Sequence, residues 1–166
     1  AVTVSEDSDT EFSGTSTALS LDLDSTGAIT DKASASLSVF NLADITGSTI
    51  TLDSTTNDFT GAVTVTGGAT TLKDANDLTV TLTTSGATDL TAVDTLTVDG
   101  TVSGATSDLT TAAAATSFGA TTVGQDLSVT ASGTVSDTGK LAVTGTTGIS
   151  AAGQTVTLDD AANDFT

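Results

Sequence analysis

The sequence predicts an all-β protein built as a parallel β-helix, in which short strands stack coil upon coil. Three observations support this fold class: an aliphatic–polar–aliphatic triplet that recurs at short intervals, an absence of Pro, Trp, Tyr, Met and Cys, and a block that occurs twice. The 166 residues are enough for a single domain, and the apolar ones are mostly small or branched. Such residues suit a thin, continuous core, because each coil of a solenoid contacts mainly its neighbours.

The first elements are expected from the amino terminus onward. Residues 1–16 begin with Ala-Val-Thr-Val, which is typical of a strand. The same stretch holds the densest group of acids: Glu6, Asp7, Asp9 and Glu11. We expect a loop here, and we expect residues 1–16 to form an acidic strand or loop that caps one end or joins a neighbouring subunit. The strict alternation from Leu19 to Leu23 then predicts a half-buried strand.

The triplet marks the later strands. It begins at Leu37, Ile50, Val63, Leu78, Leu96, Leu127, Leu141 and Val156. Most of these starting points are evenly spaced, and the one long interval, from Leu96 to Leu127, is about two ordinary steps and skips a strand near residues 111–115. If two or three strands make one coil, a coil holds on the order of 20 residues and the chain roughly seven to nine coils. Gly, Asn, Asp and Ser between the triplets indicate turns.

Helix and sandwich alternatives fit less well. Thr and Val abound, and no window sustains helical spacing of apolar residues. The helix-prone run Ala112–Ala115 lies at a strand position, so a coil corner or a weak strand is favoured there. An antiparallel sandwich would call for aromatic core anchors, proline at edges and unequal loops, and the chain offers few aromatics and no proline.

The repeated block covers residues 47–60 and 153–166, at an offset of 163 − 57 = 106 residues. Both copies end in Asn-Asp-Phe-Thr, which we interpret as an Asx turn followed by Phe59 or Phe165 turning inward to fill a corner. The first copy continues as Gly-Ala-Val-Thr-Val, and the chain begins with Ala-Val-Thr-Val. The sequence therefore predicts an excerpt of a longer array, or a subunit that stacks end to end. The predicted assembly interface is Ala1, Val2, Thr3, Val4, Asn163, Asp164, Phe165 and Thr166.

A family resemblance rests on the second copy, Leu158-Asp-Asp-Ala-Ala-Asn-Asp-Phe-Thr166, and on the continuation of the first through Gly61-Ala-Val-Thr-Val-Thr-Gly-Gly68 and Leu72-Lys-Asp-Ala-Asn-Asp-Leu78. Over about residues 47–82 and 141–166 the chain resembles repeats of filamentous-haemagglutinin-type exoproteins. That resemblance implies a right-handed parallel β-helix in a secreted "beta strand repeat" surface protein of bacteria, used in adhesion. It also implies an extracellular or cell-surface location, with the secretion route left open.

Charge and composition exclude several function classes. The chain has 21 acids, three lysines and no arginine, for a formal charge of −18. A nucleic-acid surface needs the opposite sign, and anionic membrane surfaces would repel this chain. No apolar run approaches the roughly 18 residues of a membrane helix, so we expect no membrane insertion. Without cysteine there are no disulfides, thiolate metal sites or cysteine nucleophiles.

Enzymatic chemistry is not expected. The chain has no His, Cys or Arg, which excludes Ser-His-Asp, Cys-His and arginine-clamped phosphoryl mechanisms. Carboxylate pairs such as Asp22 with Asp24, or Asp74 with Asp77, are the only catalytic candidates, and no Tyr or Trp is present to bind a sugar. We therefore expect no catalytic residues and no organic cofactor.

Calcium is the one cofactor that the sequence leaves open. It binds six to eight oxygens, and stacked coils could bring successive Asp turns together. The alternative is a solvated acidic face, and known calcium loop motifs such as Asp-x-Asp-x-Asp-Gly are absent. The candidate ligands are Asp74, Asn76, Asp77, Asp159, Asp160 and Asp164.

Together these features predict a non-catalytic structural or adhesive segment that forms a stalk or filament shaft by end-to-end stacking. Its expected partners are copies of itself head to tail, with a host or cell-surface receptor as a further one. Two alternatives stay open: a calcium-binding surface-layer or adhesin module, and an ice- or glycan-binding β-helix. The second rests on outward threonines such as Thr64 and Thr79, in rows that Ser, Asp and Ala interrupt.

Overall fold

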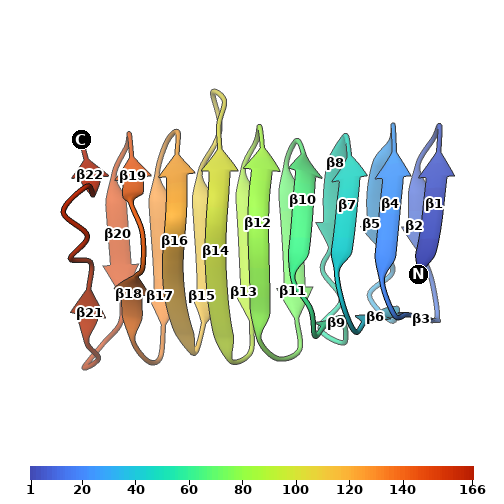
Figure 1. Ribbon diagram of the computed structural model, residues 1–166, viewed down its shortest axis with the longest axis horizontal. Coiled ribbons are helices and arrows are strands. Elements are labelled where there is room, and N and C mark those ends of the chain that lie inside the picture. Colours follow the sequence, from blue (N-terminus) through green and yellow to red (C-terminus); the bar gives the residue numbers. More distant parts are fainter.

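The chain winds through about eight coils of parallel strands in the computed structural model, which describes residues 1–166 (Figure 1). It contains 22 strands and no helix. Strands in the front of Figure 1 point up, those behind them point down, and the coils advance from the N end to the C end, which makes the coil right-handed. The predicted right-handed parallel β-helix of seven to nine coils is confirmed.

Three sheets run along the axis. Sheet A contains β1 (Val2–Glu6), β4 (Leu21–Ser25), β7 (Ala43–Gly47), β10 (Val63–Gly67), β12 (Leu78–Thr84), β14 (Thr95–Val102), β16 (Ala115–Val123), β18 (Val135–Asp137), β19 (Leu141–Val143), β21 (Val156–Thr157) and β22 (Asp164–Phe165). Sheet B contains β2 (Thr10–Phe12), β5 (Ala28–Asp31), β8 (Thr49–Leu52), β11 (Thr70–Asp74), β13 (Thr88–Ala92), β15 (Leu109–Ala113), β17 (Leu127–Ala131) and β20 (Thr147–Ser150). Sheet C contains β3 (Thr15–Ala18), β6 (Ser36–Val39) and β9 (Asp58–Phe59), so it belongs to the first three coils.

Equivalent residues stack in ladders from coil to coil. One interior ladder of sheet A runs through Val2, Leu21, Ala43, Val63, Val80, Val98 and Phe118. These 118 − 2 = 116 residues span six coils of about 19 residues, in agreement with the expected length. The triplets, however, lie on different faces: Leu37 is in sheet C, Ile50 in sheet B and Val63 in sheet A. The short interval between these triplets is therefore a move from one face to the next.

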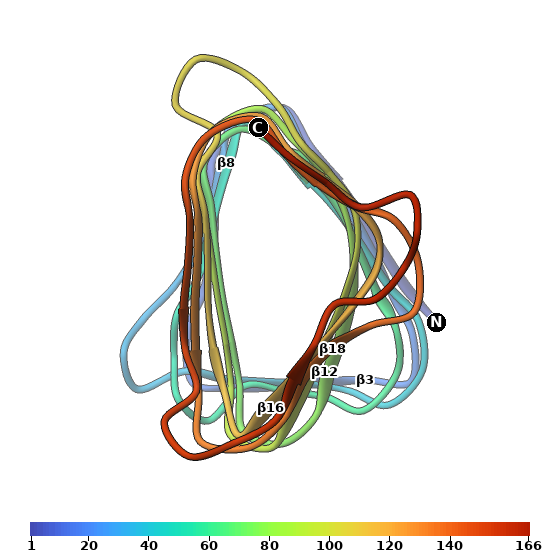
Figure 2. The same cartoon turned by 90° about the vertical axis from the view of Figure 1, so that its left-hand side faces the viewer.

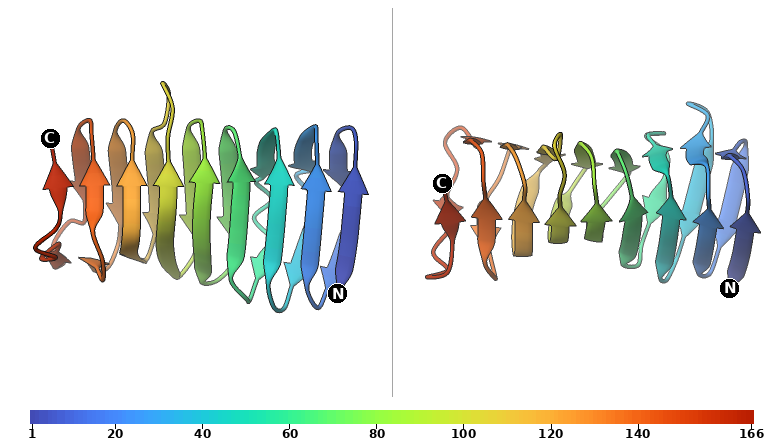
Figure 3. Two further views of the ribbon diagram at one scale, coloured as in Figure 1. Left: turned by 45° about the horizontal axis from the view of Figure 1, so that its top comes forward. Right: turned by 90° about the horizontal axis from the view of Figure 1, so that it is seen from above.

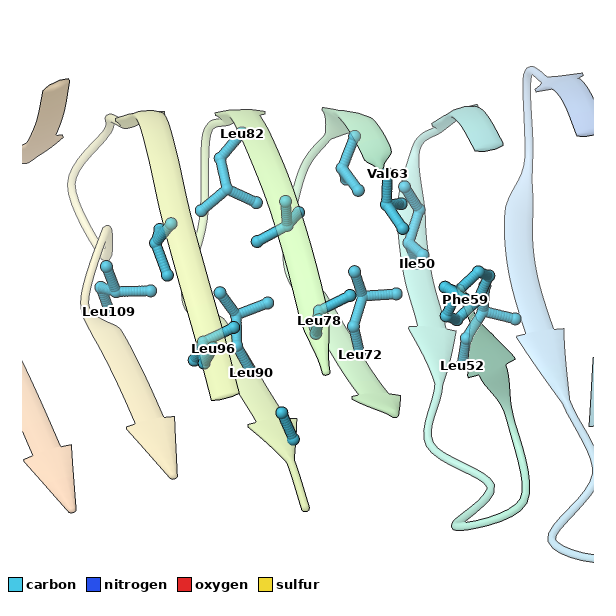
Figure 4. Close-up of a cluster of buried hydrophobic side chains, with 14 of the residues drawn as sticks. Ile50, Leu52, Phe59, Val63, Leu72, Leu78, Leu82, Leu90, Leu96 and Leu109 are labelled. Atoms are coloured by element: carbon cyan, nitrogen blue, oxygen red, sulfur yellow. The ribbon is translucent and has the colours of Figure 1, made fainter. Parts of the chain in front are cut away.

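The core is the narrow space between the sheets. Figure 4 shows side chains such as Ile50, Leu72, Leu78 and Leu96 projecting into it from both sides. These side chains are fully buried, and they belong to one continuous apolar cluster of 31 residues. Phe59, the last residue of β9, points inward and is 1% exposed, as predicted, whereas Phe165 in the last coil is 44% exposed.

Two sequence segments fold as the same series of strands on opposite faces. Thr10–Phe12 of β2 pairs with Ile29–Asp31 of β5 in sheet B. The segments that lie 106 residues later in the sequence pair in the same register but in the other sheet: Thr116–Phe118 pairs with Val135–Asp137 in sheet A. Likewise β4 of sheet A corresponds to β17 of sheet B. That offset is about five and a half coils, so the second segment is turned by about half a coil. Accordingly, the first and last coils bulge at different corners in Figure 2.

The shorter middle coils produce this change of face. The coil from Val63 to Val80 contains 80 − 63 = 17 residues, and the coil from Val80 to Val98 contains 98 − 80 = 18 residues. No strand of sheet C is present between β10 and β14. The coils nonetheless stay stacked in one row in every view (Figure 3).

Two local predictions can be compared directly with these strands. The acidic stretch in residues 1–16 was expected to be a loop between two strands, and Asp7 and Asp9 do lie in the turn between β1 and β2. Glu6, however, ends β1 and Glu11 lies in β2, so the segment builds most of the first coil. Strand positions tolerate these acids because both side chains are exposed. The run Ala112–Ala115 forms the end of β15, a corner at Ala114 and the start of β16, which confirms the corner or weak strand.

Candidate functional site

The repeated block forms a hydrogen-bonded tie between coils, which we call the Asp–Asn clamp. The carboxylate of Asp31 accepts backbone N–H groups of Asp53 at 3.0 Å and Ser54 at 3.2 Å in the next coil. It also accepts a hydrogen bond from the side-chain amide of Asn57, at 2.6 Å. The Oδ1 atom of Asn57 in turn accepts a hydrogen bond from the backbone N–H of Leu37, one coil back, at 3.0 Å. Asn57 is fully buried. Every polar atom in this tie therefore links neighbouring coils.

The second copy builds the same clamp at the carboxyl-terminal end. Asp137 accepts the N–H groups of Asp159 and Asp160 and the side-chain amide of Asn163. Asn163 in turn accepts the N–H of Leu141 at 2.7 Å. Desolvation raises the pKa of Asp137. The hydrogen bonds from Asn163, Asp160 and Asp159 together lower it by more, so the pKa lies below its ordinary 3.8. The clamp therefore holds Asp137 in its charged form.

Other aspartates tie successive coils with one hydrogen bond each. The backbone N–H groups of Ala28, Thr95, Ala120, Asp126 and Thr146 donate to Asp9, Asp77, Asp99, Asp108 and Asp126 respectively, at 2.7–3.2 Å. The bond from the Thr146 N–H also lowers the pKa of Asp126. A substantial share of the negative charge thus serves backbone pairing at corners and bulges, where the strand ladders are interrupted.

The first calcium candidates lie at the end of β11 and in the turn that leads to β12. Asp74 is 2% exposed, and its carboxylate accepts the N–H groups of Phe59 and Asn76, each at 2.7 Å. Burial raises the pKa of Asp74, the hydrogen bonds from Phe59 and Asn76 lower it, and the nearby charges of Asp58 and Asp77 raise it, for a net rise. Asp77 accepts the N–H of Thr95.

The second calcium candidates lie in the last coil. Asp160 accepts the N–H of Ala162 at 2.8 Å, while Asp159 and Asp164 are exposed. The two candidate groups thus occupy different coils, and the structure has no group of three or more acidic residues placed to hold one metal ion. Calcium binding stays a prediction.

The predicted assembly residues lie at opposite ends of the solenoid (Figure 1). Val2 and Val4 occupy interior ladder positions above Leu21 and Leu23, yet Val2 is 42% exposed because β1 is paired on one edge only. Phe165 continues the interior ladder of Val143 and is 44% exposed. Both ends therefore present inward-facing apolar side chains to solvent.

Sheet A carries a straight column of outward threonines. Thr46, Thr66, Thr83, Thr101 and Thr122 lie one above another in β7, β10, β12, β14 and β16. The column ends at Asp24 on one side and at Ala142 on the other. The parallel row of Thr64 and Thr81 is interrupted by Asp44 and Asp99, as expected. The column is thus more regular than the sequence alone suggested.

Three exposed apolar residues gather at another place, the corner that leads into sheet A in the first two coils. Leu19, Phe40 and Leu42 are 61%, 55% and 52% exposed. Backbone hydrogen bonds from Asn41 to Leu19 and from Leu21 to Leu42 hold the two coils together there. The candidate catalytic residues Asp22 and Asp24 lie nearby on the outer face of β4, both exposed. The structure has no helix long and apolar enough to cross a membrane.

Comparison with protein families gives one match, to repeats of unknown function (DUF5649), over residues 1–66 and 106–166. The match covers 66 + 61 = 127 of the 166 residues. The chain belongs to this repeat family. The two matched segments are the ones whose strands correspond across the offset of the repeated block, so the family repeat is a unit of about three coils.

The other comparisons add no relative. No curated protein and no solved structure matches the chain. Nothing in these findings points to filamentous-haemagglutinin-type exoproteins in particular, so that finer resemblance stays a prediction.

Sequence reasoning missed two features of these surfaces. It did not identify Asp31 and Asp137 as partners of the repeated Asn, although both lie 26 residues before it. It also did not identify β20 as a strand with an unpaired edge at the carboxyl-terminal end. The signal for both was present, because the offset of the repeated block extends upstream to Thr10-Glu-Phe12 and Thr116-Ser-Phe118.

Proposed function

We propose that this repeat protein is a non-catalytic shaft segment of a secreted or surface-displayed bacterial β-solenoid, lengthened by end-to-end stacking. The observation that carries the proposal is the pair of uncovered ends: Val2 at one end and Val156 and Phe165 at the other are 42–44% exposed at interior ladder positions. A further coil on either end would bury them, with a gain of about 25 cal/mol per Å² of apolar surface.

The proposed location is supported by composition. A chain without cysteine needs no particular redox environment, and a formal charge of −18 keeps parallel shafts apart in solution. The resemblance to secreted repeat proteins points the same way. Adhesion then belongs to another part of the assembly, and the shaft supplies reach.

Stacking is tested by sedimentation velocity and negative-stain microscopy over a range of concentrations. We expect the unmodified chain to form longer rods as its concentration rises. Phe165→Asp places a charge at the uncovered end and should weaken this association at least tenfold. Val93→Asp is the matched control, because Val93 is 62% exposed on the side of a middle coil. A chain that stays monomeric at every concentration would contradict the proposal.

A second candidate function, ice or glycan binding, is favoured by the threonine column of sheet A. Five threonines repeat there at the strand spacing of about 4.8 Å. Such a row of hydroxyl and methyl groups suits a periodic solid surface. Thr83→Lys should then abolish inhibition of ice recrystallisation or binding to a crystalline glycan, whereas Thr51→Lys on sheet B should not. No inhibition and no glycan binding by the unmodified chain would exclude this candidate.

A further inference from the structure

Comparison of the two repeats shows which strand at the carboxyl-terminal end has an unpaired edge. In the first repeat, β7 pairs with β4 on one side and with β10 on the other, where Val63 lies opposite Ala43 and Val65 opposite Ile45. In the second repeat, β20 takes the place of β7, because it pairs with β17 as β7 pairs with β4. No strand pairs with the other edge of β20. The missing neighbour of β20 is therefore the equivalent of β10.

The first strand of the chain has the features that this place requires. Residues 1–4, Ala-Val-Thr-Val, have the same sequence as residues 62–65, which form the start of β10 and the residue before it. Val2 and Val4 face inward as Val63 and Val65 do, and β1 pairs only with β4, so its outer edge is also open. Since β10 follows the first copy of the repeated block, β1 of another chain can follow the second.

We propose that β1 of a second copy pairs in parallel with β20, with Val2 opposite Thr147 and Val4 opposite Ile149. Sheet A of the added copy then continues sheet B of the first, so successive copies are turned by about half a coil around the shared axis. This inference rests on the proposed stacking and adds its geometry.

Side-chain chemistry favours this half-coil turn over stacking in phase. With the turn, β2 of the added copy follows β21, as β11 follows β8, which places Phe12 over Leu158 and Thr10 over Val156. In phase, sheet A would continue sheet A, and Glu6 would lie over Phe165 with Val4 over Asn163. A charged side chain above an apolar ring is unfavourable, whereas Val4 over Ile149 and Phe12 over Leu158 bury apolar surface.

Engineered cysteines distinguish the two arrangements, because the chain has no native cysteine. Ser5 and Ser150 are exposed and point outward from β1 and β20, so S5C with S150C should form disulfides between copies turned by half a coil. In-phase stacking would instead bring Ser5 beside Asp164. The comparison variant is S5C with D164C, and the first variant also carries Asp164→Ser so that both lack the same charge.

Oxidised samples are compared on non-reducing gels, after circular dichroism has shown that both variants keep the β fold. We expect a ladder of dimers and higher multimers from the Ser150 variant and at least tenfold less cross-linking from the Asp164 variant. A ladder from the Asp164 variant, alone or equally, would overturn the half-coil turn while leaving stacking intact. No ladder from either variant would overturn both the geometry and the stacking.

Discussion

Asn57 shows at the scale of one residue what the repeated block does. Its fully buried side chain lies in the third coil and binds both Asp31 and the backbone of Leu37 in the second coil. Asn57→Ala would leave a buried N–H and part of a carboxylate without partners, so we expect a loss of about 2–3 kcal/mol in the free energy of unfolding. Urea titration followed by circular dichroism measures it.

Asn163→Ala is the matched control for that variant. Asn163 makes the equivalent contacts but lies in the partly exposed last coil, so water can replace the lost bonds. We expect a clearly smaller loss at concentrations where the chain is monomeric. Equal losses for both variants would show that burial does not set the strength of the clamp.

Buried threonines offer a test with the opposite sign. The hydroxyl of Thr116 is buried without a hydrogen-bond partner, whereas that of Thr121 donates to the carbonyl of Val98 at 2.9 Å. Thr116→Val should stabilise the chain by about 1 kcal/mol, because it removes an unpaired polar group at nearly constant volume. Thr121→Val should destabilise it by a similar amount. Thermal and urea unfolding of the two variants check both signs.

The change in stability of the chain at low pH follows from aspartates whose pKa values are shifted by hydrogen bonds or burial. The pKa values of Asp137 and Asp126 lie below 3.8, so their contribution to stability is present above that pH and is lost as the pH falls through the folded-state pKa. Asp74 acts in the opposite direction. Its pKa is raised by burial, so its contribution is present below 3.8 and is lost as the pH rises through the folded-state value.

We therefore expect Asp137→Asn to be less stable than the unmodified chain near pH 6 and to lose less stability between about pH 5 and pH 2. Urea midpoints across that range measure both effects. Asp44→Asn, on the exposed outer face of β7, is the control and should change neither. An unchanged acid profile in Asp137→Asn would refute the role of the clamp.

At the scale of an element, the β14–β16 pair contains the one irregular register. The pairing shifts after Val98, so that Gly119 and Ala120 both lie opposite Asp99. The Asp99 carboxylate accepts the N–H of Ala120 at 2.8 Å and so replaces the interrupted ladder bond. Gly100 has a φ of 105°, and a Cβ there would overlap the backbone of Leu82.

Gly100→Ala should consequently destabilise the chain by about 2–4 kcal/mol, from backbone strain together with steric overlap. Gly14→Ala provides the comparison, because Gly14 has a φ of 67° and no atom within 4 Å of its Cβ position. We expect about 1 kcal/mol for that variant, from strain alone. Similar values by urea unfolding would mean that the bulge gives way to the added methyl group.

The elements could be predicted from the sequence to the extent that alternation defines them. Leu21 and Leu23, or Ile50 and Leu52, announce strands because polar residues separate inward positions. The face on which each strand lies could not be read in this way, since Leu37, Ile50 and Val63 look alike and lie in three different sheets. The sheet in which a strand lies depends on the number of residues between successive turns. The lengths of these turns, which are rich in glycine and aspartate, vary by several residues from coil to coil.

The candidate sites were predictable to a similar degree. The matching termini indicated the two apolar ends, but the sequence alone could not show what Asp74 and Asp160 bind. A turn carboxylate has the same letter whether its partner is a metal or a backbone amide. In the structure both accept backbone N–H groups. Phe59, one of the two donors to Asp74, lies in the preceding coil, and a sequence pattern of one coil does not reveal such a partner.

For the whole molecule, net charge is the dominant electrostatic feature. Twenty-one acids face three lysines, and the ion pair between Lys32 and Glu11, at 3.0 Å, is exposed on both sides. Added salt should therefore raise the melting temperature, because it screens repulsion more than it weakens attraction. Scanning calorimetry between about 10 and 500 mM NaCl measures the rise. A falling melting temperature would show that attractive pairs dominate.

Calcium at matched ionic strength completes that experiment. Screening alone predicts nearly the same melting temperature in CaCl2 and NaCl of equal ionic strength. A further rise of several degrees in CaCl2, reversed by a chelator, would support the predicted calcium binding. No further rise would exclude it at that concentration.

The exchange of faces between the two repeats also bears on the mechanics of a long assembly. Sheet C widens the first three coils on one side, and in the second repeat the equivalent strands, β19 and β22, belong to sheet A instead. A bend favoured by the asymmetric outline of the first repeat of a chain is therefore opposed by its second repeat. A fibre built from such repeats would remain straight over long distances, where identical faces in constant phase would let small bends accumulate into a curve.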